Sequence, residues 1–156
     1  MLPDKSVIKE FFKIYYGSKG VIGGQGFFID DKSTIWASAY DLDEVVEKAA
    51  SLAEGHEIWF NTALHDKEMA KEDYLRRKPG NNPRYARGTE KTVRTVFGAF
   101  IDIDVRGPGH AQDNLPETKE IAMQFLKTLP FNITINIDSG GGIHAYALFD
   151  KPYHIC

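Results

Sequence analysis

The sequence predicts an α+β fold in which a mixed sheet is flanked by helices. Apolar residues recur every three to four positions in some stretches and every second position in others, which indicates interspersed helices and strands. The chain has 156 residues, of which 42% are hydrophobic and 26% are charged. That length and composition are typical of a globular domain, so we expect residues 1–156 to form a single domain.

The N-terminal half alternates helical patterns with short strand patterns. Asp41 is followed three residues later by Glu44, the spacing of a capping box at a helix start. Residues 17–26 contain five glycines and are predicted to form turns, because they match neither a P-loop nor a dinucleotide-binding pattern. The elements expected here are helices over residues 3–16 and 66–75 and between residues 41 and 55, and strands over residues 27–29, 34–39 and 57–63, with a turn near 31–32.

The C-terminal half reads as strand, helix, strand, strand. Pro116 suits a first helical position and Pro130 stops the helix. We expect strands over residues 96–106, 132–138 and 143–149. The helix residues expected to face inward are Ile121, Ala122, Phe125, Leu126 and Leu129.

Pairing in the last hairpin is constrained by its polar residues. Directly opposed residues of an antiparallel pair share a face. Placing Asp138 opposite His144 gives one consistently polar face, whereas a four-residue loop would place Ile137 there. The sequence therefore predicts an odd-length loop or a glycine bulge.

Bulk properties exclude several classes of protein. No apolar run approaches 18 residues, and the N-terminus lacks a signal-peptide pattern, so we expect a cytoplasmic protein with no membrane partner. The single Cys156 excludes an intrachain disulfide and a Cys-rich zinc site. The net charge of −3 gives no global sign of nucleic-acid binding, so any such sign must be local.

Two aspartates interrupt the strand expected over residues 96–106. Its odd positions are all apolar, whereas its even positions end in Asp102, Asp104 and Arg106. Side chains two apart share a face, with Cα atoms about 6.5–7 Å apart. Two carboxylates at that spacing can converge on a divalent cation, which would also relieve their mutual repulsion. The alternative is a solvated strand face near a sheet edge.

A glycine-rich stretch precedes the last strand. Ser139, Gly140, Gly141 and Gly142 join two alternating strands and lead to His144. Consecutive glycines let a backbone approach a ligand closely and expose N–H groups towards phosphate. The alternatives are a flexible hairpin loop and a structural histidine.

Together the two stretches resemble the archaeo-eukaryotic primase superfamily, especially the primase-polymerase domains of plasmid and phage replication proteins. That family carries D-x-D on one strand and a small residue, any residue and His on another. Asp102-Ile103-Asp104 matches the first motif and Gly142-Ile143-His144 the second, with Ser139–Gly141 as the small lead-in. The resemblance covers residues 58–153 and implies an RRM-like C-terminal unit, which the order of elements over residues 95–149 also suits.

One departure from the family concerns its third acidic motif, expected on a strand after His144. Asp150 sits at a strand end just before Pro152, and no convincing match follows. We therefore expect a chain truncated before the third motif, whose metal site is incomplete.

The resemblance implies template-directed nucleotidyl transfer to a 3′-hydroxyl, as in primer synthesis and DNA replication. Asp102, Asp104 and His144 would be the catalytic residues, with Mg²⁺ or Mn²⁺ on the two aspartates. Ser139–Gly142 and His144 would bind the triphosphate of an NTP or dNTP. Arg106 would either add charge there or pair with the aspartates. Expected partners are a single-stranded DNA template with its primer and a helicase domain in the same or a neighbouring chain.

Residues 76–94 form a locally basic segment. Seven basic residues stand against one acid, Glu90, and Gly80-Asn81-Asn82-Pro83 breaks any helix there. The segment is predicted to contact nucleic-acid phosphates, with an aromatic ring available to stack on a base; the alternative is a solvated loop. The residues concerned are Arg76, Arg77, Lys78, Arg84, Tyr85, Arg87, Lys91 and Arg94.

Two other functions compete with polymerisation. A non-catalytic domain that binds single-stranded nucleic acid on an RRM-like sheet would tolerate loss of the aspartates and bind in EDTA. A metal-dependent replication-initiator endonuclease of the rolling-circle or relaxase type would need clustered histidines. The five histidines include no H-x-H pair.

Overall fold

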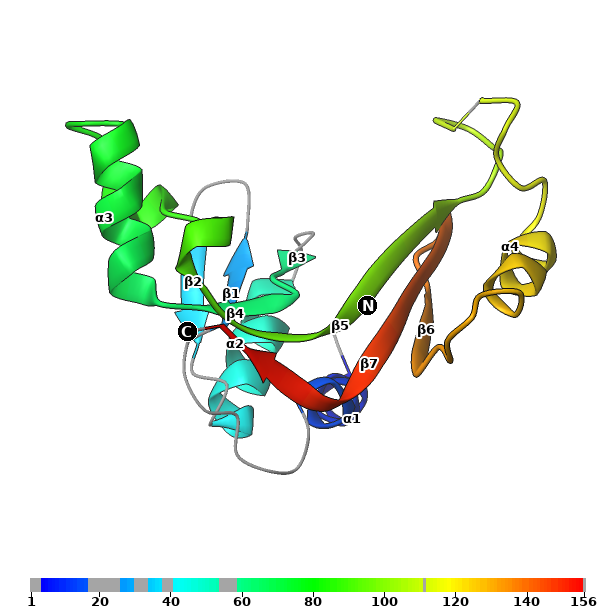
Figure 1. The fold of residues 1–156 in the computed structure, drawn as a ribbon, viewed down its shortest axis with the longest axis horizontal. Coiled ribbons are helices and arrows are strands. Elements are labelled where there is room, and N and C mark those ends of the chain that lie inside the picture. Colours follow the sequence, from blue (N-terminus) through cyan, green and yellow to red (C-terminus); the bar gives the residue numbers. More distant parts are fainter. Residues whose placement is uncertain are drawn as a thin grey trace. The chain divides into compact units, whose positions relative to one another are not determined.

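The computed structural model describes residues 4–16, 26–29, 34–37, 41–53, 59–110 and 112–155. These residues form an α+β fold with four α-helices, two short 3-10 helices and two sheets (Figure 1). No helix within the described ranges has both the length and the apolar character needed to cross a bilayer. The chain divides into unit 1, residues 1–97 and 151–156, and unit 2, residues 98–150.

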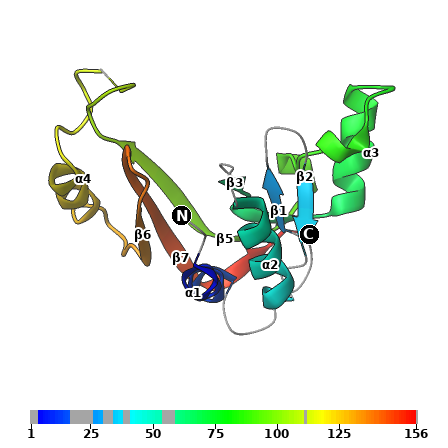
Figure 2. The same cartoon turned by 180° about the vertical axis from the view of Figure 1, so that it is seen from behind.

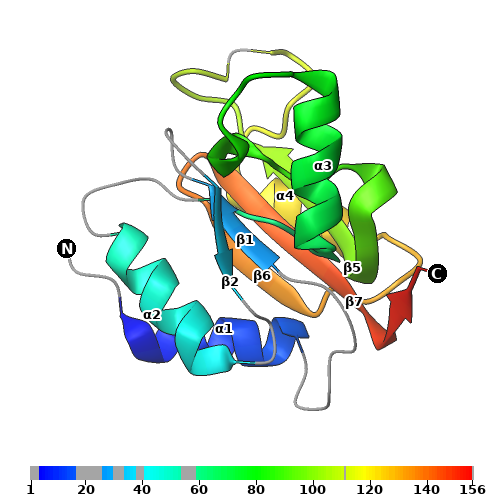
Figure 3. The ribbon, with the colours of Figure 1, turned by 90° about the vertical axis from the view of Figure 1, so that its left-hand side faces the viewer.

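In unit 1, two amphipathic helices lie side by side, α1 (Lys5–Tyr16) and α2 (Leu42–Ala53) (Figure 3). Ion pairs join their exposed faces, with 2.7 Å between Lys5 and Glu47 and 2.6 Å between Lys9 and Asp43. The predicted cap of α2 is confirmed, because the Asp41 carboxylate accepts a hydrogen bond from the backbone N–H of Glu44 at 2.9 Å.

A three-stranded antiparallel sheet in the order β2–β1–β3 belongs to the same unit, with β1 (Gly26–Ile29), β2 (Thr34–Ala37) and β3 (Trp59–Phe60). The predicted hairpin is confirmed by the pairing of Ile29 with Thr34. Its turn at 31–32, the glycine-rich segment 17–25 and the helix stop at Gly55 lie outside the described residues.

The core of unit 1 is aromatic. Phe12, Tyr15 and Tyr16 of α1 are buried, and Phe60 of β3 meets Phe12 and Tyr15 edge-on with ring centroids 5.5 and 5.3 Å apart. Tyr16 meets Phe97 edge-on at 5.2 Å. Such edge-to-face pairs add to the stabilisation that burial of the rings already supplies.

The single strand expected over residues 57–63 is wrong, because the chain turns in the middle of it. The Asn61 side chain accepts a hydrogen bond from the backbone N–H of Ala63 at 2.7 Å, an Asx turn that interrupts the strand. The residues beyond the turn form β4 (Ala63–His65), which belongs to a different sheet from β3.

The helix predicted from Asp66 is confirmed as α3 (Lys67–Arg77), capped by the Asp66 carboxylate, which accepts from Met69 N at 3.0 Å. The predicted break follows, with Gly80 at a φ of +79°. Two 3-10 helices then lead to the next strand, η1 (Pro83–Tyr85) and η2 (Glu90–Thr92).

His65 is a buried histidine at the end of β4. Its Nδ1 lies 3.0 Å from Thr92 Oγ1 and its Nε2 lies 3.1 Å from Asn61 Oδ1. Burial lowers the pKa of His65 from 6.5 to about 4. The folded state therefore keeps this ring neutral over a pH range in which the unfolded chain protonates it.

The shift predicts an acid-sensitive stability. The contribution of His65 is fully present above pH 6.5 and is lost as pH falls towards 4, by up to about 1.4 kcal/mol per pH unit. Urea unfolding at pH 7.5 and pH 5 should therefore show a larger loss in wild type than in His65→Gln. Equal losses in the two proteins would contradict this role of His65.

The second sheet has four antiparallel strands in the order β4–β5–β7–β6, with β5 (Val93–Asp104), β6 (Ile135–Asp138) and β7 (Gly142–His154) (Figures 1 and 2). The expected mixed sheet is therefore corrected. A helical crossover does connect β5 to β6, but β7 lies between these two strands and pairs with both. Every pair of neighbouring strands in this sheet is therefore antiparallel.

In unit 2, the crossover helix α4 (Lys119–Leu126) starts later than predicted. Thr118, and not the turn at Pro116, caps it, because its hydroxyl accepts from Ile121 N at 3.4 Å. Ala122 and Leu126 are buried against Ile143 and Ala145 of β7, with Ile101 and Ile103 of β5 beside them. Ile121 and Phe125 are exposed, contrary to the prediction, because so short a helix presents only one narrow stripe to the sheet.

The predicted odd-length hairpin loop is also wrong. Asp138 pairs with Ile143 and Ile137 pairs with His144, so residues 139–142 form a four-residue loop. Ile143 and Ala145 occupy the face packed on α4, which turns His144 to the opposite face. Asp138 is tolerated on the α4 side because Lys119 Nζ lies 2.6 Å from its carboxylate.

Candidate active site

The face of the unit 2 sheet opposite α4 carries a cluster of polar and aromatic side chains. Asp102 Oδ1 of β5 lies 3.5 Å from His144 Nε2 of β7. On the same face, the Phe100 ring lies 5.4 Å from the His144 ring and 5.1 Å from the Tyr146 ring, between centroids. The structure thus brings together the first aspartate and the histidine that the two sequence motifs singled out.

Asp104 lies two residues beyond Asp102, so strand alternation turns it to the same face. Its Oδ2 is 3.4 Å from His110 Nδ1. His110 reaches the strand end because a tight turn folds back there, with Gly107 and His110 exchanging two backbone hydrogen bonds of 3.0 Å. Each aspartate therefore has its own imidazole neighbour.

The acidic groups and the histidine are open to solvent. The side chains of Asp102, Asp104 and His144 are 51%, 46% and 35% exposed. Among the described residues, no three His, Cys, Asp or Glu side chains converge closely enough to enclose a metal ion by themselves. A cation held by Asp102 and Asp104 would therefore complete its coordination with water or ligand oxygens, as Mg²⁺ commonly does.

Two aromatic residues border the cluster. Tyr146 is buried, and burial together with the negative charge of Asp102 raises the pKa of its hydroxyl to about 12. The hydroxyl therefore remains a neutral hydrogen-bond donor at physiological pH. Phe100 is 43% exposed, so one part of its ring faces solvent.

Sequence reasoning missed three members of this cluster: Phe100, His110 and Tyr146. Phe100 lies two residues before Asp102 and Tyr146 two residues after His144. Strand alternation places each pair on one face, and this spacing could have identified both aromatics. His110 follows Gly107-Pro108-Gly109, and a turn of that kind returns the chain towards the strand it has just left.

The glycine-rich loop has structural reasons for its composition. Ser139 N donates to Gly142 O at 3.1 Å, and Gly140 N donates to Asp138 Oδ1 at 2.8 Å. Gly140 has a φ of +87°. Two of the N–H groups predicted to bind triphosphate are thus engaged within the hairpin.

Gly142 serves the contact between β5 and β7. A Cβ atom at Gly142 would lie 2.1 Å from Ile103 O and 3.0 Å from the Asp104 Cα, far inside van der Waals contact. Gly98 is similar, since its Cβ would lie 2.1 Å from Ala147 O. The lack of side chains at these two positions lets the strands carrying Asp102 and His144 approach closely.

Arg106 lies just beyond β5 and turns away from the strand. Its guanidinium donates to the Asp113 carbonyl at 2.7 Å and lies 3.5 Å from Glu117. Its observed partners are therefore Asp113 and Glu117, and neither is an aspartate of the cluster.

The basic segment belongs to unit 1, where acids outside it supply partners. Arg76 and Arg77 both bind Asp73, and Arg94 lies 3.6 Å from Asp66. The Arg84 guanidinium sits 4.7 Å from the centroid of the Tyr85 ring, which covers one side of that ring. The remaining predicted members are Lys78, whose ammonium lies 5.8 Å from the Tyr74 ring, and the exposed Arg87 and Lys91.

Comparison with known proteins adds no assignment, since no family model, no curated protein and no solved structure matches this chain.

Proposed function

We propose that the chain is a template-directed nucleotidyltransferase of the primase-polymerase type, which adds nucleotides to a 3′-hydroxyl. The observation that supports this most is the 3.5 Å approach of Asp102 to His144 on the sheet face opposite α4, with Asp104 next along the same strand face. Two motifs that are distant in sequence and that resemble those of one enzyme family meet on one accessible surface.

The side chains of the cluster suit the roles that nucleotidyl transfer requires. Asp102 and Asp104 present hard carboxylate oxygens, which would hold Mg²⁺ or Mn²⁺. Such a cation, when bound, neutralises charge on the phosphates and on the attacking oxygen. His144 Nε2 faces the same space and would donate to a phosphate oxygen. Burial and the charge of Asp102 keep the neighbouring Tyr146 hydroxyl protonated by raising its pKa to about 12.

The order of elements supports the same proposal. β5, α4, β6 and β7 follow one another in the chain, and β7 lies between β5 and β6 with α4 on one face. This arrangement is consistent with the RRM-like unit that the family resemblance implies.

A second candidate is non-catalytic binding of single-stranded nucleic acid on the same sheet face. Phe100 favours it, because a large aromatic side chain that is 43% exposed lies on the open face of a sheet. Aromatic rings on open sheet faces stack on unpaired bases, and a base would need no cation for that contact.

Primer extension on a single-stranded template distinguishes the two candidates. Incorporation that requires Mn²⁺ or Mg²⁺ and stops in EDTA supports the nucleotidyltransferase. Binding of a fluorescent single strand that persists in EDTA, with no incorporation under any metal condition, supports the binding domain.

A further inference from the structure

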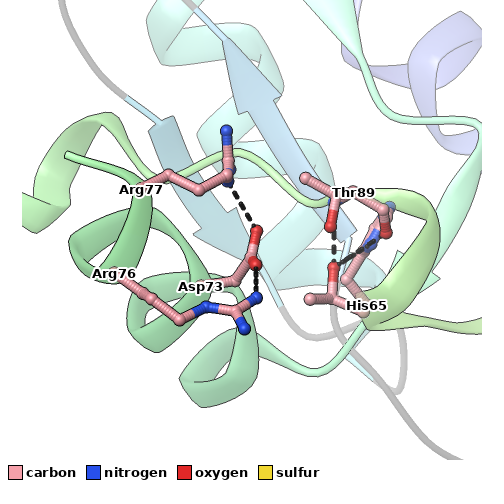
Figure 4. A network of polar contacts seen from close by, with 6 residues as sticks. His65, Asp73, Arg76, Arg77 and Thr89 are labelled. Carbon is pink, nitrogen blue, oxygen red and sulfur yellow. Dashed lines mark hydrogen bonds and ion pairs between the residues drawn. The ribbon is translucent and has the colours of Figure 1, made fainter.

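An open hollow of about 560 Å³ lies in unit 1, between the C-terminal turns of α3 and the helix η2. Its volume is within the range of about 300–1,000 Å³ that small ligands occupy in proteins. Three basic and two acidic residues and one threonine line it: Asp73, Arg76, Arg77, Thr89, Glu90 and Lys91. Figure 4 shows Asp73, Arg76, Arg77 and Thr89 of this set. The hollow therefore gathers three of the seven basic residues of the segment 76–94.

Asp73 sets the positions of two of the cations. Its Oδ1 accepts from Arg76 Nη2 at 2.6 Å and its Oδ2 accepts from Arg77 Nε at 2.8 Å (Figure 4). The Asp73 side chain is 10% exposed. Its pKa is lowered, and the hydrogen bond from Arg76 is the largest cause. One carboxylate thus orients two guanidiniums, and each guanidinium retains N–H donors for another acceptor.

The neighbouring helix η2 (Glu90–Thr92) holds Lys91 at the edge of the hollow. Thr92 Oγ1 accepts from Thr89 N at 2.9 Å and donates to Thr89 O at 3.0 Å. Nδ1 of the buried His65 ring lies 3.0 Å from the same oxygen. These bonds fix the turn that carries Lys91. The Thr89 side chain closes the same turn in a capping box with Thr92, and its Oγ1 is buried.

We propose that this hollow binds one backbone phosphate of a single-stranded nucleic acid, held by Arg76, Arg77 and Lys91. Guanidinium groups match phosphate oxygens in geometry, and an ammonium adds a compact charge. The identity of the polyanion rests on the proposed function, whereas the anion site rests on the hollow itself. Glu90 limits the net charge, which favours a single phosphate over a diffuse polyanion surface.

The test compares two lysines that carry the same charge. Lys91→Gln should weaken binding of an oligo-dT strand and reduce the slope of log K against log salt by about 0.7, the value for one lost phosphate contact to a single strand. Lys13→Gln removes the same charge from the exposed face of α1, outside the basic segment, and should leave the slope unchanged. Equal loss of slope in both variants would show diffuse attraction and overturn the proposal.

Two further arms separate the possible failures. If inorganic phosphate protects the protein from thermal unfolding but Lys91→Gln leaves strand binding intact, the hollow is a site for free anions and the proposal fails. Primer extension by the wild-type protein tests the proposed catalysis separately. No incorporation, together with a salt slope that Lys91→Gln lowers and Lys13→Gln does not, would refute the nucleotidyltransferase and leave this site standing.

Discussion

Asp102→Asn and Asp104→Asn are each expected to lower nucleotide incorporation by at least about 100-fold, the scale seen when one directed polar group is removed from an active site. The amide keeps the size of the carboxylate but loses the negative charge that a divalent cation requires. Both aspartates are about half exposed, so their loss should leave the fold intact. Single-turnover primer extension with Mn²⁺ measures the effect.

Asp138→Asn is the matched control. Asp138 is also an exposed aspartate of a unit 2 strand, but it pairs with Lys119 on the α4 side of the sheet. Its replacement should leave incorporation within about threefold of wild type, since surface substitutions remote from a site have small effects. Full activity in Asp102→Asn and Asp104→Asn would remove both residues from any catalytic role.

Gly142→Ala is expected to destabilise unit 2 strongly. The new methyl group would lie 2.1 Å from Ile103 O, so β7 would have to move away from β5. Overpacking of this kind costs about 1–3 kcal/mol and occasionally more. Each kcal/mol lowers the melting temperature of a chain of this size by about 2–4 °C. Hydrogen exchange in β5 and β7, measured with thermal unfolding, locates the effect.

Gly141→Ala provides the control one residue away. A Cβ there would lie 3.6 Å from His110 Nε2, an ordinary van der Waals contact. Its stability should stay within about 0.5 kcal/mol of wild type. Gly142→Ala should also reduce incorporation, because the strand shift separates Asp102 from His144. Equal stability of the two variants would mean that β5 and β7 do not need the close approach.

Much of the fold follows from local patterns. Asp41 and Asp66 cap the helices that begin beside them, and the alternation of apolar residues in β5 predicts which face carries Asp102 and Asp104. These features depend on interactions within a few residues, which a sequence displays directly. Alternation along β7 likewise turns His144 and Tyr146 to one face.

The errors arise where distant segments decide the outcome. The register of β6 on β7 is set by the packing of Ile143 and Ala145 on α4, so a rule that grouped polar residues on one face failed. Gly142 was attributed to ligand approach, but its neighbour is the backbone of β5. Asp73 stands outside the basic segment, yet the helical repeat places it against Arg76 and Arg77.

The most direct measurement follows the imidazole signals of His144 by NMR during titration with Mn²⁺. The account predicts that substoichiometric Mn²⁺ broadens the His144 signals and that Asp102→Asn abolishes the broadening, because the Asp102 carboxylate that would hold the ion lies 3.5 Å from the His144 ring. Unchanged His144 signals in wild type, or equal broadening in the variant, would contradict a cation site formed by Asp102 and Asp104 beside His144.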